Sequence, residues 1–294
     1  MAELIMSTCT QGLIYALISY GVYITYTILD FPDLSVDGSF PLGAAVTAVL
    51  LNQGVNPFLT LPVALLFGAF AGLCTGLIHV KLHVRDLLAG IITMTALFSI
   101  NLQIGGSNLM VPRSINTIFN ADITMKLMGN QTMTVRKLVL SILLVLIVKI
   151  LLDWYLRTKS GLLLRAVGDN RTLVTALAQN AGNIKIKGLM LSNALVALAG
   201  CIICHEQRSF TATMGTGQVV FGLAAVIIGI SFFKKLSFVK GTTAVVAGSV
   251  IYKTCIQIAI NVGLPANLLK LITAVMFLLV LVISNKKGEE IIHA

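Results

Sequence analysis

The sequence has 294 residues, of which 57% are apolar and 11% charged, with a mean hydropathy of +0.94 and a formal net charge of +10. This composition excludes an ordinary soluble domain and indicates an integral membrane protein. The basic residues form no stripe with interleaved aromatic residues, which argues against nucleic-acid binding. Membrane topology and attraction to lipid headgroups account for the positive charge instead.

Apolar stretches recur along the whole chain, and a bilayer core of roughly 30 Å needs about 20 such residues in a helix. The N-terminal residues include Glu3 and no Lys or Arg, so we expect them to remain in the mature protein rather than to form a signal peptide. The stretches lie at about 10–29, 38–52, 58–79, 87–105, 136–156, 186–205, 217–233, 238–262 and 267–284. We therefore predict an all-α, polytopic membrane protein with eight or nine transmembrane helices in a single domain, 1–294.

The second stretch is the exception, because it is short and follows the polar run Asp33–Gly38. Backbone of this kind at membrane depth survives only when it is buried in protein or lines water. We therefore predict that this span is short or discontinuous.

The positions of Lys and Arg predict the orientation, because basic residues are retained in short cytoplasmic loops. Four basic clusters fall on one side if every intervening stretch crosses once; they are Lys81/Arg85, Arg157 to Lys187, Lys234/Lys235/Lys240 and Lys286/Lys287. This places the C-terminus inside and the loop 105–135 outside. It also places the N-terminus outside, unless the second stretch is re-entrant.

The longest cytoplasmic connection, 157–187, contains an alanine-rich run that favours a short helix near 172–180. Asp169 or Asn170 can cap its start, and Gly182 suits the position after its end. Such a helix fits a groove on another protein. The alternative is a plain surface loop that only supplies positive charge.

Helical spacing predicts two local contacts. Gly68, Gly72 and Gly76 recur every four residues and form a seam for close helix packing. We expect this seam to join helices within the chain rather than between subunits. Lys149 and Asp153, one turn apart, are expected to pair near the inner surface.

Several segments resemble one family, the ABC permeases of the branched-chain amino-acid and ribose type. They are Gly161–Asn170 with Ala176 and Asn180–Asn183, then Leu195–Gly200, Leu34–Phe40 with Leu42–Ala45, and Phe221–Gly229. The runs Asp33–Gly38 and Asp86–Leu97 resemble a subgroup described as tryptophan- or tyrosine-type uptake permeases. Relatives often carry a Gly pair where this chain has Lys234 and Lys235, which puts details of the inner gate in doubt.

The resemblance implies a bacterial plasma-membrane importer in which two permease copies, here expected to be identical, form the path. Two cytoplasmic ABC ATPases and an external solute-binding lipoprotein complete it. The helix near 172–180 would be the coupling helix that sits on the ATPase, and the residues implied in coupling are Arg165, Asp169, Asn170, Thr172, Ala176, Asn180 and Gly182. The chain has no Gly-x-x-x-x-Gly-Lys-Ser/Thr loop, so we expect ATP to bind only the partner and this chain to be no enzyme.

Polar side chains inside spans are costly and are therefore candidates for the solute path. The predicted path residues are Asp33, Ser35, Asp37, Ser39, Asn101, Asn193 and Gln257, with Ser99, Gln103, Ser192, Lys253 and Asn261 as further candidates. The alternative is that they hydrogen-bond neighbouring helices, with Lys253 reaching toward the membrane surface.

Cys201, Cys204 and His205 match the short pattern for covalent haem attachment. The pattern lies in an apolar span without a nearby second ligand, so we predict neither a haem nor any other cofactor or metal.

Two other function classes compete with the importer. An ion-coupled secondary transporter favours inverted repeats and buried carboxylates, and this chain shows no evident repeat. A membrane enzyme would have to use His79, His83 and Asp86, which a basic cytoplasmic turn explains better. The preferred solute is an amino acid, first an aromatic one; a nucleoside or sugar is the alternative.

Overall fold

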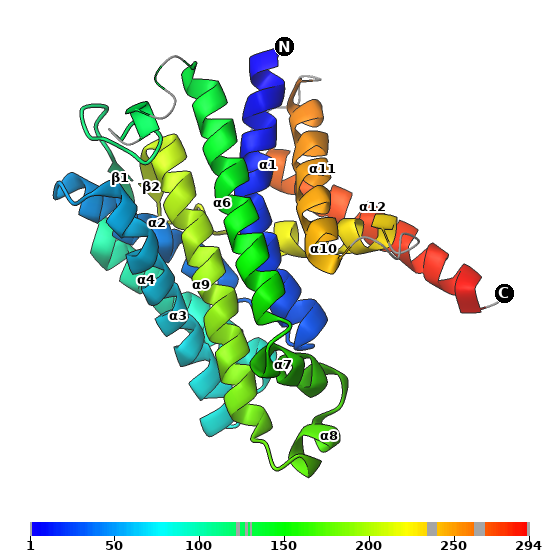
Figure 1. Cartoon of the computed structure of the whole chain (residues 1–294). Coiled ribbons are helices and arrows are strands. Elements are labelled where there is room, and N and C mark those ends of the chain that lie inside the picture. The colour runs from blue at the N-terminus through cyan, green and yellow to red at the C-terminus, as the bar shows by residue number, and fades with distance from the viewer. Residues whose placement is uncertain are drawn as a thin grey trace.

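A computed structural model describes residues 2–121, 124–126, 129, 131–233, 240–261 and 268–292, and it shows a bundle of helices (Figure 1). The elements are α1 (Ala2–Val22) with the π-helix η1 (Tyr23–Ile28), α2 (Val36–Asn52), α3 (Pro57–Lys81), α4 (Asp86–Gly105), β1 (Asn108–Met110), α6 (Met133–Tyr155), α7 (Lys159–Asp169), α8 (Arg171–Ala176), α9 (Ala181–Gln207), β2 (Ser209–Thr211), α10 (Gln218–Phe233), α11 (Gly241–Asn261) and α12 (Leu269–Ile292). The strands β1 and β2 form a short antiparallel pair with Leu109 opposite Phe210. The predicted all-α class is confirmed.

Each predicted apolar stretch coincides with a helix. Five helices in the described residues are long and apolar enough to cross a membrane: α1 with η1, α3, α4, α9 and α11. The helices α2 and α10 are apolar but shorter, with 17 and 16 residues. The number of crossings therefore stays a prediction.

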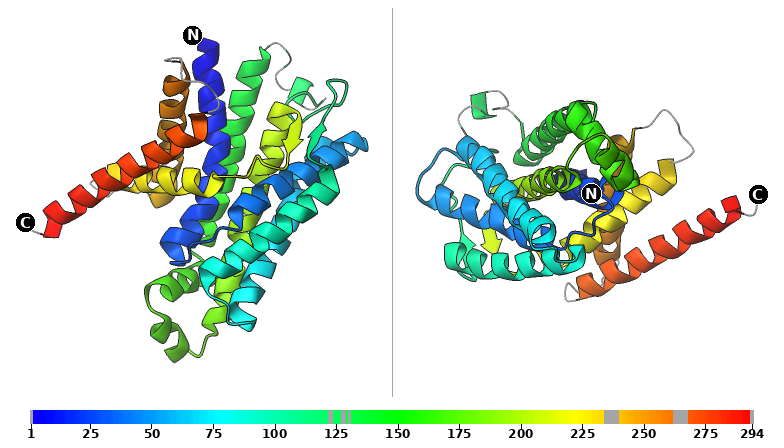
Figure 2. Two further views of the ribbon diagram at one scale, coloured as in Figure 1. Left: turned by 180° about the vertical axis from the view of Figure 1, so that it is seen from behind. Right: turned by 90° about the horizontal axis from the view of Figure 1, so that it is seen from below.

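The two ends of the bundle differ. In Figure 1 the N-terminus and the strands β1 and β2 lie at one end, whereas α7, α8 and the turn between α3 and α4 lie at the other. The chain runs from the N-terminal end into the bundle in α1, and α2 starts inside the bundle and returns to the first end (Figure 2). This arrangement agrees with an N-terminus on the same side as the loop 105–135.

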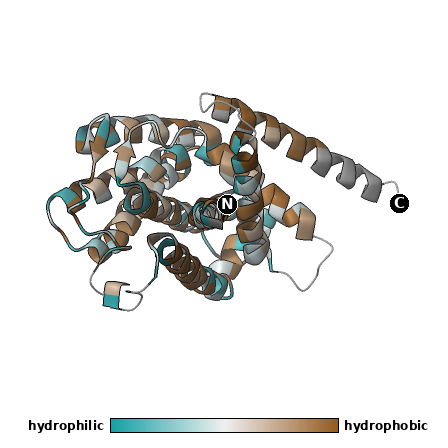
Figure 3. Ribbon diagram, turned by 90° about the horizontal axis from the view of Figure 1, so that it is seen from above, coloured by the Kyte–Doolittle hydropathy of each residue, from teal (hydrophilic) through white to brown (hydrophobic). Residues whose placement is uncertain are grey.

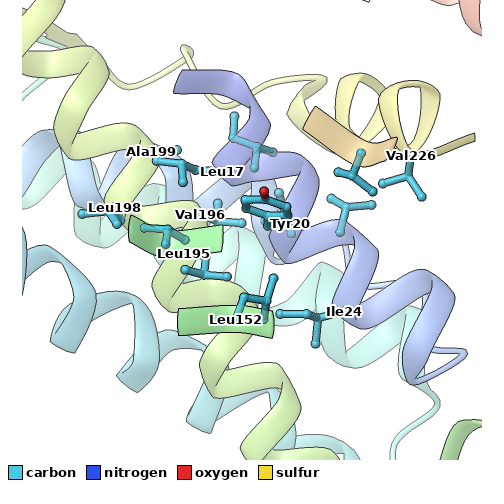
Figure 4. Packing of buried hydrophobic residues seen from close by; sticks show 14 of the residues in the cluster. Leu17, Tyr20, Ile24, Leu152, Leu195, Val196, Leu198, Ala199 and Val226 are labelled. Atoms are coloured by element: carbon cyan, nitrogen blue, oxygen red, sulfur yellow. The ribbon is translucent and has the colours of Figure 1, made fainter. Parts of the chain in front are cut away.

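Helix α9 forms the centre of the bundle, because 83% of its most apolar window is buried, against 28% for α4. It packs against α3, α2 and α1. Figure 4 shows Leu17 and Tyr20 of α1 facing Val196 and Ala199 of α9, and all four side chains are buried.

Glycines allow the neighbouring helices to approach α9 closely. A Cβ on Gly72 would lie 2.2 Å from the carbonyl oxygen of Leu189, and one on Gly68 would lie 2.4 Å from that of Asn193. A Cβ on Gly76 would likewise lie 3.0 Å from the Cα of Ile186. The predicted glycine seam is thus confirmed as packing within the chain, between α3 and α9.

The outer faces of α4 and α6 are apolar and exposed. Large exposed side chains include Ile92 and Phe98 on α4 and Leu143 and Leu151 on α6. Apolar residues also predominate in the helices seen from the N-terminal end in Figure 3. These faces suit a lipid environment or a second membrane subunit.

Candidate functional site

The chain between η1 and α2 is an irregular segment inside the bundle. It turns at Asp30, whose φ is +50°. The carboxylate Oδ1 of Asp33 accepts a hydrogen bond of 2.8 Å from the backbone N–H of Ser35, which precedes the first residue of α2. A side chain thus helps to start a helix that begins in mid-bundle. The predicted discontinuous span is present here.

Four of the predicted path residues meet around Asn193, at the middle of α9. Its Nδ2 donates to Asp33 Oδ2 at 2.9 Å and to the Leu189 carbonyl at 3.1 Å. Its Oδ1 accepts from Ser35 Oγ at 3.1 Å and from Ser39 Oγ at 2.6 Å.

This Asn193 cluster, made of Asp33, Ser35, Ser39 and Asn193, is completely enclosed. Asp33 is 4% exposed and the other three are 0% exposed. A buried carboxylate is tolerated only when hydrogen bonds satisfy it, which is the arrangement seen here. The cluster therefore clamps the start of α2 to α9 in this conformation, and a direct role in the solute path stays a prediction.

Asp37 joins the two short helices α2 and α10. Its carboxylate accepts from the backbone N–H of Gly217 at 2.9 Å and from that of Val219 at 2.8 Å. The first N–H groups of a helix have no partner within it, so Asp37 caps α10 from a different helix. The starts of α2 and α10 consequently lie together inside the bundle.

A small cavity of about 180 Å³ lies beside this junction, between α2, α4 and the turn after β2. We call it the junction cavity, and it is lined by Asp37, Gly38, Pro41, Met94, Thr95, Phe98, Asn101, Ala212 and Thr216. Asn101 is fully buried, and its Nδ2 donates to the Gly38 carbonyl at 3.0 Å. Its Oδ1 has no partner among the described residues. The cavity thus combines apolar walls with a carboxylate, an amide and hydroxyl groups.

Two polar side chains at the cavity, those of Thr95 and Thr216, are absent from the predicted path residues. Thr95 lies within Asp86–Leu97, so the resemblance of that run was a signal that pointed to it. Thr216 follows β2 in a turn, and no pattern in the sequence identifies it.

The other predicted path residues lie elsewhere. Gln257 is half-buried on α11, which packs mainly against α10 and α1. On the same face, Lys253 places its Nζ 4.5 Å from the centre of the Tyr15 ring. Ser99 and Gln103 are exposed on the outer face of α4.

Ser192 behaves as the alternative interpretation predicted. Its Oγ donates to the Gly21 carbonyl of α1 at 2.9 Å and so joins two helices.

The connection 157–187, predicted to be cytoplasmic, contains two helices, whereas one was predicted near 172–180. The first, α7, ends at Asp169, and Asn170 then caps α8 by accepting from the Thr172 N–H at 3.0 Å. Helix α8 ends at Ala176 after six residues, and Ala178 has a φ of +54°. The alanine-rich composition favoured a longer helix, but local capping divides the segment.

Gly182 was predicted to follow the end of the helix near 172–180, and this placement was wrong, whereas the coupling roles of Asn180 and Gly182 stay predictions. The Oδ1 of Asn180 accepts from the N–H groups of Gly182 and Asn183, at 2.9 and 3.3 Å, and thereby caps the start of α9. Gly182 therefore opens the next helix instead of ending the previous one. A Cβ there would meet Val80 of α3 at 2.5 Å, so its absence serves packing.

The tip of α8 projects beyond the bundle at the end opposite the N-terminus (Figure 1). Val174 is fully buried and anchors the helix, whereas Ala176 and Leu177 are exposed, Leu177 by 56%. An exposed leucine beside an alanine is a feature that a partner protein can cover. Leu177 was not among the predicted coupling residues, although it lies between two of them.

Helix α7 connects this tip to the irregular segment. A Cβ on Gly168 would lie 2.0 Å from the Ile28 carbonyl at the end of η1. Leu164 is buried. A Cβ on Gly188 of α9 would lie 2.5 Å from the Leu29 side chain and 2.7 Å from that of Leu164. Helix α7 is therefore in direct contact with the chain that leads into the Asn193 cluster.

Cys201, Cys204 and His205 are buried on α9. The Nε2 of His205 lies 2.9 Å from Thr60 Oγ1, which makes the histidine a contact between α9 and α3. Among the described residues, no three His, Cys, Asp or Glu side chains are grouped so as to hold a metal ion.

Comparison with known proteins agrees with this architecture. A family model described as the permease component of branched-chain amino acid transport systems matches residues 4–281. The tyrosine transport system permease protein of Clostridioides difficile is 42% identical over 281 residues, covering 96% of this chain and 91% of that protein. The ribose import permease of Escherichia coli is 27% identical, covering 87% and 77%.

A probable branched-chain amino acid permease of Methanocaldococcus jannaschii is 27% identical, covering 72% of this chain and 69% of that protein. With its interrupted helices, its capped junction and a family match over almost its whole length, the chain belongs to the family of branched-chain amino acid transport permeases, the membrane-spanning components of ABC-type transporters.

Proposed function

We propose that this chain forms the solute path of an importer for an amino acid, with tyrosine as the first candidate. The observation that supports a transport path is the junction cavity, where α2 and α10 begin side by side under the cap of Asp37. Transporters commonly place solutes beside such interrupted helices near mid-membrane. The name of the 42% identical relative supports tyrosine as the solute.

The proposed mechanism is alternating access. ATP binding and hydrolysis take place on partner ATPases, and this chain holds neither nucleotide nor another cofactor. The ATPases press on Ala176 and Leu177, and α7 passes the displacement to η1 through the Gly168–Ile28 contact. The shift of η1 then moves the Asn193 cluster and opens the junction cavity inward.

The proposed assembly contains two copies of this chain, two ATPases and an external solute-binding lipoprotein, in the plasma membrane of a bacterium. Thr95 and Thr216 line the junction cavity and are exposed. A solute path there must be closed on that exposed side, which supports a second permease copy as the other wall of the path.

Replacing Leu177 by glutamate is expected to reduce ATPase stimulation at least about 10-fold, because a charge would be buried against the partner. The side chain is exposed, so folding should be unaffected. The measurement is ATP hydrolysis and ATPase co-purification of the reconstituted complex. Met110→Glu is the matched control, since Met110 is 70% exposed on β1, at the opposite end of the bundle. Equal activity of the two variants would argue against α8 as the coupling element.

Replacing Thr95 by valine is expected to slow solute uptake about 5-fold, because the solute loses one neutral hydrogen bond. Within the described part of the chain, the Thr95 hydroxyl bonds only the Ile91 carbonyl of its own helix, so the change should leave stability intact. Thr254→Val is the control, because Thr254 is exposed on α11 and bonds the Val250 carbonyl in the same way, at 2.7 Å. Identical uptake rates for both variants would remove Thr95 from the path.

A sugar is the second candidate solute, supported by the ribose import permease among the relatives. Uptake of labelled tyrosine and ribose by vesicles that contain the permease, its ATPase and its binding protein decides between them. Uptake driven by an ion gradient without ATP would contradict the importer altogether and favour a secondary transporter.

A further inference from the structure

A second cavity lies near the ends of α6 and η1, beside α7 and the start of α11. Its volume is about 490 Å³, and it is lined by Tyr23, Asp153, Leu156, Arg157, Leu162, Arg165, Lys240, Gly241 and Thr242. The proposed solute path does not involve it. Of these residues, Arg165 was predicted to act in coupling and Asp153 to pair with Lys149, but none was predicted to bind a ligand.

The charges at this cavity are unbalanced. Its carboxylate, on Asp153, is already shared by Lys149 at 3.5 Å and Lys240 at 3.3 Å, so the predicted Lys149–Asp153 pair is confirmed and extended. Arg157 and Arg165 are exposed at the cavity and have no carboxylate partner within the described ranges. The site therefore has an excess of positive charge and suits an anion.

Further hydrogen-bond donors face the same space. The cavity includes Gly241 and Thr242, the first residues of α11, where backbone N–H groups have no partner within the helix. The hydroxyl of Tyr23 lies 2.6 Å from the position that a Cβ on Gly241 would occupy. Donors at a helix start beside two guanidinium groups are well suited to phosphate oxygens.

The outer face of α6 leads from the membrane to this cavity. Its exposed residues Leu143, Ile147 and Leu151 are followed by Trp154, which is 67% exposed. Tryptophan is enriched at the level of lipid headgroups. Arg157 follows in the next turn, where its N–H donates to the Trp154 carbonyl at 3.1 Å. The apolar face thus ends, and the basic cavity begins, at headgroup depth.

We propose that this cavity binds the phosphate of an anionic phospholipid from the leaflet on the α7–α8 side. Arg157 and Arg165 contact the phosphate oxygens, and the acyl chains lie along the apolar face of α6. The continuity of that face with the cavity favours a lipid over free inorganic phosphate. Because α7 and η1 both border the site, the bound lipid would also brace the coupling path.

The test uses the full chain in nanodiscs of phosphatidylcholine mixed with phosphatidylglycerol. Lipid that stays bound after extraction into mild detergent is identified by native mass spectrometry. The double variant Arg157→Gln/Arg165→Gln should retain about 30-fold less phosphatidylglycerol than the unmodified chain, since two cation–phosphate contacts are lost. The control Lys159→Gln/Arg85→Gln removes two exposed cations that do not line the cavity, and it should retain phosphatidylglycerol normally.

Two further measurements keep the test decisive. Thermal unfolding must show that both double variants are folded. If the arginine-to-glutamine variant is not, Arg157→Lys/Arg165→Lys replaces it, because lysine keeps the charge but lacks the planar guanidinium group. This variant should show an intermediate loss of bound phosphatidylglycerol. Inorganic phosphate added to phosphatidylcholine nanodiscs should not displace labelled phosphatidylglycerol at equal concentration. Three results would each overturn the proposal. All variants could retain the lipid equally, the arginine variant and its control could lose it equally, or the arginine variant could lose ATPase assembly while it retains the lipid normally.

Discussion

Replacing Asn193 by leucine should lower the free energy of unfolding by about 3–5 kcal/mol, because it takes the side-chain amide donor away from the buried carboxylate of Asp33. Leucine has a similar size, but it removes the donor to Asp33 and the acceptor for Ser35 and Ser39. Thermal unfolding of the purified chain in detergent measures the loss, and uptake should fall with it because the start of α2 loses its attachment to α9.

The control for this change is the neighbouring substitution Ser192→Ala. It removes a single hydrogen bond to the Gly21 carbonyl and should cost about 1 kcal/mol. A second comparison tests the cause: Asp33→Leu/Asn193→Leu should be more stable than Asn193→Leu alone, because the carboxylate that lost the Asn193 donor is no longer present. If the double variant is the less stable of the two, the buried charge is not the source of the effect.

Replacing Gly43 by alanine should also prevent normal folding, with a cost above about 4 kcal/mol. A Cβ at Gly43 would lie 1.9 Å from the carbonyl oxygen of Ala197, which belongs to the backbone of α9 and cannot move aside. Alanine normally stabilises a helix interior by about 1 kcal/mol relative to glycine, so the expected sign is opposite to that of helix propensity.

The yield of monodisperse protein after detergent extraction measures this effect. Ala96→Val serves as the control, because Ala96 is exposed on the outer face of α4 and has room for a larger side chain. Normal yield of Gly43→Ala would mean that α2 and α9 are less closely packed than the structure shows.

Composition and periodicity were sufficient to predict the long apolar helices, because each apolar stretch must satisfy its backbone hydrogen bonds internally in a lipid environment. The glycine seam on α3 was predictable for a related reason, since a four-residue repeat of small residues lets another helix approach closely, although only the structure identifies that helix as α9. The Lys149–Asp153 pair followed from helical spacing alone.

The sequence was less informative where capping decides the structure. Asn170, Asn180 and Gly182 all suit helix ends, but their composition does not say which helix each one begins or ends. The tertiary structure resolves this, because Gly182 must lie against Val80 of α3. The exposed tip at Leu177 followed only from that arrangement.

The sequence by itself determined that the chain lies in lipid, where its long apolar helices are, and which polar residues need a hydrogen-bond partner. The last point follows because burying a polar group in lipid without a partner costs too much free energy. Only the tertiary structure decided which of these residues meet. Asn193 lies more than 150 residues from Asp33, Ser35 and Ser39 in the chain, yet it hydrogen-bonds all three. Gln257 carries the same amide group as Asn193 but lies on α11, away from the Asn193 cluster. The packing of whole helices decides which residues so distant in sequence come into contact.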